Sequence, residues 1–139
     1  MGTRDIARSE VLRSTLYQRV HAFMETRDVL VLPTVAATPF PVEQIYPTEI
    51  DGKPLDDYTH WFRLTYAITL TGLPAISVPC GFTREGLPVG LQIVGRRRQD
   101  AAVLTAAAAF ESAAPWADRV PPVVAAFATP GAGLAAVRA

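Results

Sequence analysis

Residues 71–95 read TGLPAISVPCGFTREGLPVGLQIVG and decide the fold that we expect for this chain. The stretch holds two short apolar runs, residues 75–79 and 89–94, which are rich in Val and Ile and are bounded by Gly and Pro. Such runs are typical of β-strands. The short polar link at residues 83–86 indicates that the two strands form an antiparallel hairpin. Because both runs are apolar at nearly every position, we expect other elements to cover both faces of the sheet.

The tripeptide Gly-Leu-Pro precedes both runs, at residues 72–74 and at residues 86–88. Gly allows the backbone angles that end a helix or a turn, and Pro sets φ for the start of an extended segment. Each tripeptide alone is explained by this role. The ordered series GLPAISVP, CGF and GLPVGLQIVG is too long to be expected by chance.

The residues upstream predict a helix that leads into a strand. Residues 5–26 carry one apolar stripe at helical spacing, formed by Leu12, Leu16, Val20 and Phe23. Residues 29–32 form a short apolar strand that Pro33 closes. A helix followed directly by an apolar strand fits an α/β fold, with a parallel or mixed sheet covered by helices.

A long loop and two further helices complete the prediction. Residues 34–54 contain four prolines and therefore predict a long ordered loop, a kind of segment that is often functional or mobile. Residues 55–70 resume a helical pattern. Asp100 is a suitable N-cap for a helix over residues 101–112, which Pro115 ends. One face of this last helix carries Val103, Ala107 and Phe110.

Length and composition narrow the class of protein. A chain of 139 residues fits one domain, which we place at residues 1–120, and the Ala-, Pro- and Gly-rich residues 121–139 predict a disordered tail. The net charge is zero, so we expect no overall electrostatic attraction to nucleic acid or to an anionic membrane. The one cysteine, Cys80, and the lack of a signal peptide indicate a cytoplasmic protein. Two histidines and one cysteine make no zinc motif, so we expect neither metal nor cofactor.

The chain resembles the amidase signature enzymes, a family that includes bacterial amidases, fatty-acid amide hydrolases and the A subunits of tRNA-dependent amidotransferases. The resemblance rests on the strand ending in Pro-Thr at residues 28–34, on the GLPAISVP and GLPVGLQIVG series, and on the helix at residues 100–111. It covers roughly residues 8–116 and implies the C-terminal part of an amidase signature fold. A small-molecule amide is then the substrate of the complete enzyme.

The resemblance also implies a Ser–Ser–Lys triad, which this chain lacks. The chemistry needs a base beside a Ser hydroxyl and backbone N–H groups, usually from a Gly/Ser-rich loop, to hold the oxyanion. The four serines, at positions 9, 14, 77 and 112, are neither adjacent to one another nor in such a loop, and the one lysine, Lys53, lies in a turn. We therefore predict no catalytic residue here and an inactive chain on its own, acting as a fragment or as one half of a split protein. The alternative is a non-catalytic association module or remnant that pairs with a separate N-terminal half or with itself.

The substrate-binding candidates also come from the resemblance, because the family's acyl-binding channel draws on the segment before Gly-Leu-Pro. They are Trp61, Phe62, Thr65 and Thr69. Residues 61, 65 and 69 share one helical face, although aromatic residues at helical spacing are also common in cores. Phe62 stands where the amidotransferase A subunits have an acidic residue associated with the amino group of glutamine, which favours less polar amides. The loop at residues 34–54 is either a wall or lid of this channel or a peripheral loop.

Two further expectations concern Gln92 and the exposed apolar surface, and the second of them separates the two hypotheses. Gln92 is a polar residue within an apolar strand, and buried polar groups are nearly always hydrogen-bonded, so we expect it to anchor a loop rather than contact substrate. A fragment of a layered domain should also expose an apolar patch well above that of a monomer, whereas an autonomous module should not.

Overall fold

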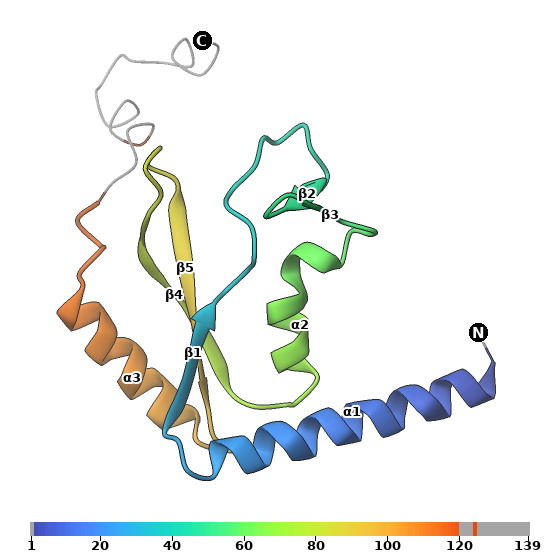
Figure 1. The fold of residues 1–139 in the computed structure, drawn as a ribbon. Helices are drawn as coiled ribbons and strands as arrows, with labels where there is room; N and C mark the ends of the chain where they lie inside the picture. The colour runs from blue at the N-terminus through green and yellow to red at the C-terminus, as the bar shows by residue number, and fades with distance from the viewer. Residues whose placement is uncertain (1, 120–123, 125–139) are drawn as a thin grey trace.

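Three strands form a sheet in the order β1-β5-β4 at the centre of the structure, a computed structural model that describes residues 2–119 and 124 (Figure 1). Strands β4 (Ala75–Phe82) and β5 (Pro88–Gly95) form the predicted hairpin, and β1 (Val29–Pro33) pairs with the other side of β5. Both pairings are antiparallel. The predicted strands are therefore confirmed, while almost all of the predicted tail lies outside the described residues.

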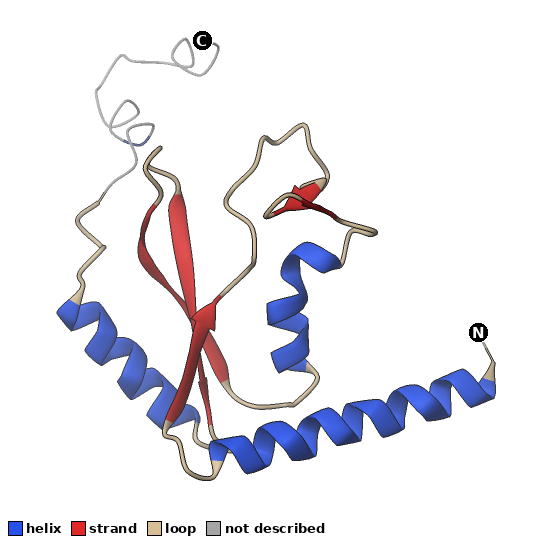
Figure 2. Cartoon of the chain, in the orientation of Figure 1, coloured by secondary structure: helices blue, strands red, loops and turns tan. Residues whose placement is uncertain are grey.

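The sheet lies between helices, which confirms the α/β class. Helix α3 (Asp100–Ala113) lies on one side of the sheet and α2 (Arg63–Thr69) on the other (Figure 2). Side chains alternate between the two faces of a strand. Accordingly, Val94 packs against Ile68 of α2, whereas a Cβ at the next residue, Gly95, would meet Val103 of α3.

The main core lies on the α2 side and is small. Its buried members are Met24, Ile68, Leu73 and Val94, with half-buried Val20, Leu30 and Leu32 packed against them. Helix α1 (Thr3–Met24) contributes only its C-terminal end to this core and extends away from the sheet toward its N-terminus (Figure 1). Two apolar residues of its N-terminal half, Ile6 and Leu12, are 52% and 60% exposed. Of the predicted apolar stripe of this helix, Val20 packs against the core, whereas Leu12 and Phe23 are exposed.

Helix cover of the sheet is also incomplete, which corrects the expectation that both faces are covered. Val31 of β1 is exposed on the α3 side, and Ala75 and Ser77 of β4 are exposed on the α2 side. Helix α3 packs mainly against β4 and β5, which leaves β1 open on that side. On the other side, an open hollow is lined by Thr69 of α2 and Ala75 of β4.

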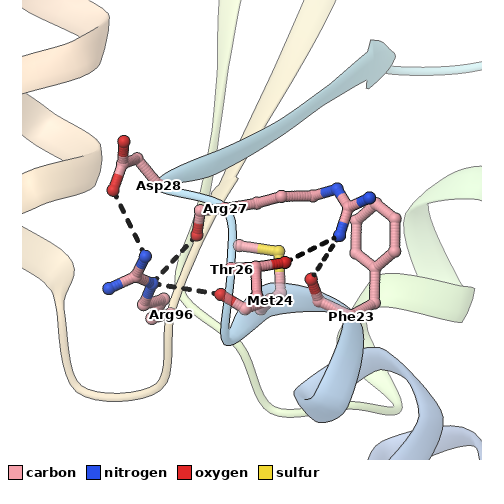
Figure 3. Close-up of polar contacts among 6 residues, drawn as sticks. All are labelled: Phe23, Met24, Thr26, Arg27, Asp28 and Arg96. Atoms are coloured by element: carbon pink, nitrogen blue, oxygen red, sulfur yellow. Dashed lines mark hydrogen bonds and ion pairs between the residues drawn. The ribbon is translucent and has the colours of Figure 1, made fainter.

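A single arginine joins the end of β5 to the turn between α1 and β1 (Figure 3). The Arg96 Nε donates hydrogen bonds to the carbonyl oxygens of Met24, at 3.1 Å, and Arg27, at 2.9 Å. Its terminal Nη2 lies 3.2 Å from a carboxylate oxygen of Asp28. Arg96 thereby fixes the direction in which α1 leaves the sheet.

The long loop and the helix after it differ in part from the prediction. Residues 34–54 include a small hairpin of β2 (Glu49–Ile50) and β3 (Lys53–Pro54), whose turn residues Asp51 and Gly52 both have positive φ. The next helix does not begin at residue 55. It starts as a 3-10 turn at His60–Phe62 and continues as α2. The Asp57 carboxylate accepts hydrogen bonds from the Thr59 N–H and hydroxyl, and this local turn competes with the helix.

Helix α3 begins one residue earlier than predicted, because Asp100 is its first helical residue and Gln99 is its N-cap. The Gln99 carbonyl accepts hydrogen bonds from the N–H groups of Ala102 and Val103, which sets the start of the helix. Val103 and Ala107 are buried as expected. Within residues 2–119 and 124, no helix has both the length and the apolar character needed to cross a bilayer.

Candidate apolar cleft

An apolar cleft of about 500 Å³ opens where the loop after β1 approaches the start of β5. No side chain that lines it is charged; the lining residues are Val35, Ala36, Ala37, Thr38, Pro39, Phe40, Trp61, Pro88, Val89 and Gly90. Part of the long loop therefore forms one wall, and the first residues of β5 form the other. Such a cleft suits an apolar group of a small molecule.

Two of the predicted site residues, Trp61 and Phe62, belong to a cluster of aromatic rings behind this cleft. Trp61 contacts Phe40 edge-on at a centroid distance of 5.5 Å and Phe62 at 5.3 Å. Tyr58 contacts both Trp61 and Phe62, and Phe62 also contacts Tyr66. Each such pair contributes about 0.5–1.5 kcal/mol beyond burial. The cluster thus holds Trp61 rigidly as a lining residue, while Phe62 supports it from behind.

The other two predicted residues, Thr65 and Thr69, do not line this cleft. The Thr65 hydroxyl donates a hydrogen bond of 2.8 Å to the Thr34 carbonyl and so ties α2 to the end of β1. The Thr69 hydroxyl donates to the Thr65 carbonyl one turn earlier in the helix, at 3.0 Å. Thr69 lines separate hollows near Gly72 and Arg97 at the opposite end of α2.

A hydroxyl pair that the sequence analysis missed lies between β1 and β4. The hydroxyl oxygens of Thr34 and Ser77 are 2.6 Å apart, although the residues are 43 positions apart in the chain. Gly90 lies between their strands, and a Cβ at this position would stand 2.8 Å from the Thr34 hydroxyl oxygen. Glycine at position 90 is therefore required by this close approach. The Pro-Thr at the end of β1 was the available signal in the sequence.

The expectation that Gln92 anchors a loop through a hydrogen bond from its amide nitrogen is wrong. Its side chain is buried, at 5% exposure, but its amide nitrogen has no hydrogen-bond acceptor among the described residues. A buried donor without a partner is rare and calls for an explanation. The indole nitrogen of Trp61 is likewise covered and has no acceptor in the described part of the chain.

No ionisable side chain among the described residues lines the cleft. The described residues contain no group of three His, Cys, Asp or Glu side chains that could hold a metal ion. Asp57 has a pKa below its ordinary value because the Thr59 hydroxyl, and then the Thr59 N–H, donate to its carboxylate. Lys53 lies exposed in β3, and Ser77 is paired with Thr34. The arrangement can bind an apolar group.

A family model and the similar known proteins point to the same family for this chain. The amidase family model matches residues 3–104. The chain is 43% identical over 117 residues to an acylamidase of Rhodococcus erythropolis, and the match covers 84% of this chain but 24% of that protein. It is 37% identical over 117 residues to the A subunit of the glutamyl-tRNA(Gln) amidotransferase of Brevibacillus brevis; this match covers 82% of the chain and 22% of that protein.

Solved structures agree with this result. A bacterial aryl acylamidase of the amidase signature family superimposes with a TM-score of 0.77 and 33% identity, over 84% of this chain and 24% of that one. The 6-aminohexanoate cyclic dimer hydrolase superimposes with a TM-score of 0.75 and 28% identity, over 89% of this chain and 27% of that one. The chain therefore spans about a quarter of the length of its relatives.

Proposed function

Because this chain belongs to the amidase family, whose model it matches over residues 3–104, we propose that it is the C-terminal portion of an amidase signature hydrolase. The complete enzyme cleaves amide C–N bonds by a Ser–Ser–Lys mechanism, and the N-terminal portion supplies those three residues. This portion contributes the β1-β5-β4 sheet and one wall of the substrate pocket.

The apolar cleft is the observation that carries this proposal. It is lined without charge, and the rigid ring of Trp61 forms part of its wall. A pocket of this kind binds the apolar part of an acyl or aryl amide and offers no carboxylate to the ammonium group of glutamine. Phe62, at the position where a carboxylate is expected in a glutaminase subunit, supports the same choice of substrate. The identity to an acylamidase is also higher than the identity to the A subunit of an amidotransferase.

The exposed apolar residues favour a fragment over an autonomous module. Ile6, Val11 and Leu12 of α1 are 52%, 65% and 60% exposed, and Val31 of β1 is 49% exposed. Burial of apolar surface contributes about 25 cal/mol per Å², so a partner that covers these side chains gains stability from the contact. We infer that the N-terminal portion of the hydrolase covers them. A second copy of the chain, or a remnant without enzymatic function, is the alternative.

A chimeric enzyme tests the proposal. This chain replaces the matching quarter of the Rhodococcus erythropolis acylamidase in one polypeptide, and hydrolysis of p-nitroacetanilide and of glutamine is followed. We expect release of p-nitroaniline by the chimera, no release of ammonia from glutamine, and no activity of the isolated chain. A folded chimera that hydrolyses no amide contradicts the hydrolase proposal and favours the association module.

The role of the cleft is tested in the same chimera. The Trp61→Ala variant is expected to raise KM for the anilide about tenfold, because it removes a large apolar ring from the lining of the cleft. Trp116→Ala is the matched control, since this tryptophan does not line the cleft. Equal KM values for the two variants would show that the cleft does not hold the substrate.

A further inference from the structure

Thr34 lies where β1 ends and the long loop begins, and it is hydrogen-bonded to three other elements. Its N–H donates to the Gly90 carbonyl of β5 at 3.0 Å, and its carbonyl accepts the 2.8 Å hydrogen bond from the Thr65 hydroxyl of α2. Its hydroxyl oxygen lies 2.6 Å from the hydroxyl oxygen of Ser77 in β4. Every hydrogen-bonding group of Thr34 is therefore engaged, each with a different element.

The contact between the Thr34 and Ser77 hydroxyls, which we call the hydroxyl bridge, crosses the middle strand of the sheet. Strands β1 and β4 are not neighbours, because β5 lies between them. Their side chains can meet because Gly90 of β5 has no Cβ, which would stand 2.8 Å from the Thr34 hydroxyl oxygen and 3.2 Å from that of Ser77. The bridge therefore ties the start of the long loop to the far strand of the sheet.

The hydroxyl bridge borders both walls of the apolar cleft. Val35, the residue after Thr34, is the first lining residue of the loop wall, and Gly90 belongs to the opposite wall. One residue further along the loop, the Ala36 N–H donates to the Trp61 carbonyl at 3.2 Å. The hydrogen bonds of Thr34 and Ala36 thus hold the beginning of the loop wall against the sheet and against the turn that carries Trp61.

We propose that Thr34 is a positioning residue of the complete hydrolase: through the hydroxyl bridge to Ser77, it fixes the spacing of the two walls of the cleft. The inference rests on the proposed function, which assigns the cleft to the apolar part of an amide substrate. Neither Thr34 nor Ser77 lines the cleft, so the bridge acts on the substrate through the walls. Contacts with a part of the substrate that does not react contribute equally in the ground state and in the transition state. Loss of the bridge should therefore raise KM and leave kcat almost unchanged.

Kinetics of the acylamidase chimera test this role. Thr34→Val keeps the shape of the side chain and removes its hydroxyl, whereas Ser77→Ala removes the partner. Each substitution is expected to raise KM for p-nitroacetanilide about fivefold, the effect of one neutral hydrogen bond, with kcat within about twofold of the wild type. The double variant should resemble either single variant, because both substitutions remove the same contact.

Two control variants accompany these measurements. Thr34→Ser keeps the hydroxyl and should restore the KM of the wild type. Thr105→Val removes a threonine hydroxyl that donates within α3 to the Ala101 carbonyl, and it should not change KM.

Hydrogen exchange of the isolated chain follows the loop wall without catalysis. The Ala36 N–H should exchange about fivefold faster in Thr34→Val and in Ser77→Ala, because the loop wall opens more often without the bridge. The Gly95 N–H, which donates to the Pro74 carbonyl, should keep its exchange rate.

The outcomes separate the positioning role from a structural role and from the proposed function. A merely structural bridge would lower Tm and the active fraction, and with it the apparent kcat, at an unchanged KM; this result would overturn the inference. A rise in KM for Thr34→Val but not for Ser77→Ala, or without faster exchange of the Ala36 N–H, would also overturn it. A folded chimera that hydrolyses no amide refutes the proposed function, and the inference falls with it. An active chimera with unchanged KM values refutes the inference alone.

Discussion

Replacing Arg96 with methionine should destabilise this chain by about 2 kcal/mol, although Arg96 lies outside every strand and helix of the fold. Methionine keeps the apolar stem of the side chain and removes its donors. The lost contacts are those of Nε with the carbonyl oxygens of Met24 and Arg27 (Figure 3). Both carbonyls lie at or just beyond the C-terminus of α1, where backbone acceptors have no partner within the helix.

The magnitude follows from the geometry. A hydrogen bond from a charged donor contributes about 1.5–3 kcal/mol, and a positive charge at a helix C-terminus adds about 0.3–1 kcal/mol. One Nε–H serves two carbonyls, and the Arg96 side chain is 35% exposed, so the lower part of this range applies. The ion pair with Asp28 adds little, because the Asp28 side chain is 98% exposed and solvent screens the pair.

Urea unfolding monitored by tryptophan fluorescence measures the free energy of unfolding of each variant. Two controls accompany Arg96→Met. Asp28→Asn removes only the exposed ion pair, and Arg97→Met changes a neighbouring exposed arginine, so both should stay within about 0.5 kcal/mol of the wild type. The reasoning is refuted if Asp28→Asn is as destabilising as Arg96→Met, or if the effect of Arg96→Met disappears in high salt, because either result would assign the stability to the ion pair.

Two further predictions follow from close contacts. Gly95→Ala should lower the free energy of unfolding by about 1–3 kcal/mol, because the new Cβ meets the side chain of Val103. Val103→Ala should restore part of this loss in the double variant, and strictly additive losses of the two substitutions would argue against the contact. The lowered pKa of Asp57 means that its stabilising effect is present above the ordinary pKa of 3.8 and is lost as the pH falls through the folded-state value. Thr59→Val should raise the Asp57 pKa in an NMR titration, and an unchanged value would exclude the Thr59 hydroxyl as the cause.

Local sequence was sufficient for the elements whose stability depends on neighbours in the chain. The hairpin of β4 and β5 follows from two apolar runs and a short turn, and both Gly72 and Gly86 have the positive φ expected of such positions. The buried face of α3 follows from its helical periodicity. The family also follows from the sequence, because its motifs lie within these same local elements.

The candidate site depended on contacts between distant parts of the chain. Among the predicted residues, Trp61 reached the cleft because Phe40 of the long loop packs against it, whereas Thr65 is occupied by the Thr34 carbonyl. Neither partner is recognisable from the spacing of residues along one helix.

The side chain of Gln92 shows most clearly that contacts between distant parts of the chain cannot be predicted from local sequence. The sequence determined that a polar side chain stands in an apolar strand, and the general rule for buried polar groups predicted a partner. Only the tertiary structure decided that this partner is absent from the described residues and that an open strand edge lies beside it. The physical reason is that hydrogen-bond satisfaction depends on which segments meet in space, whereas strand and turn formation depend mainly on the residues next to one another in the chain.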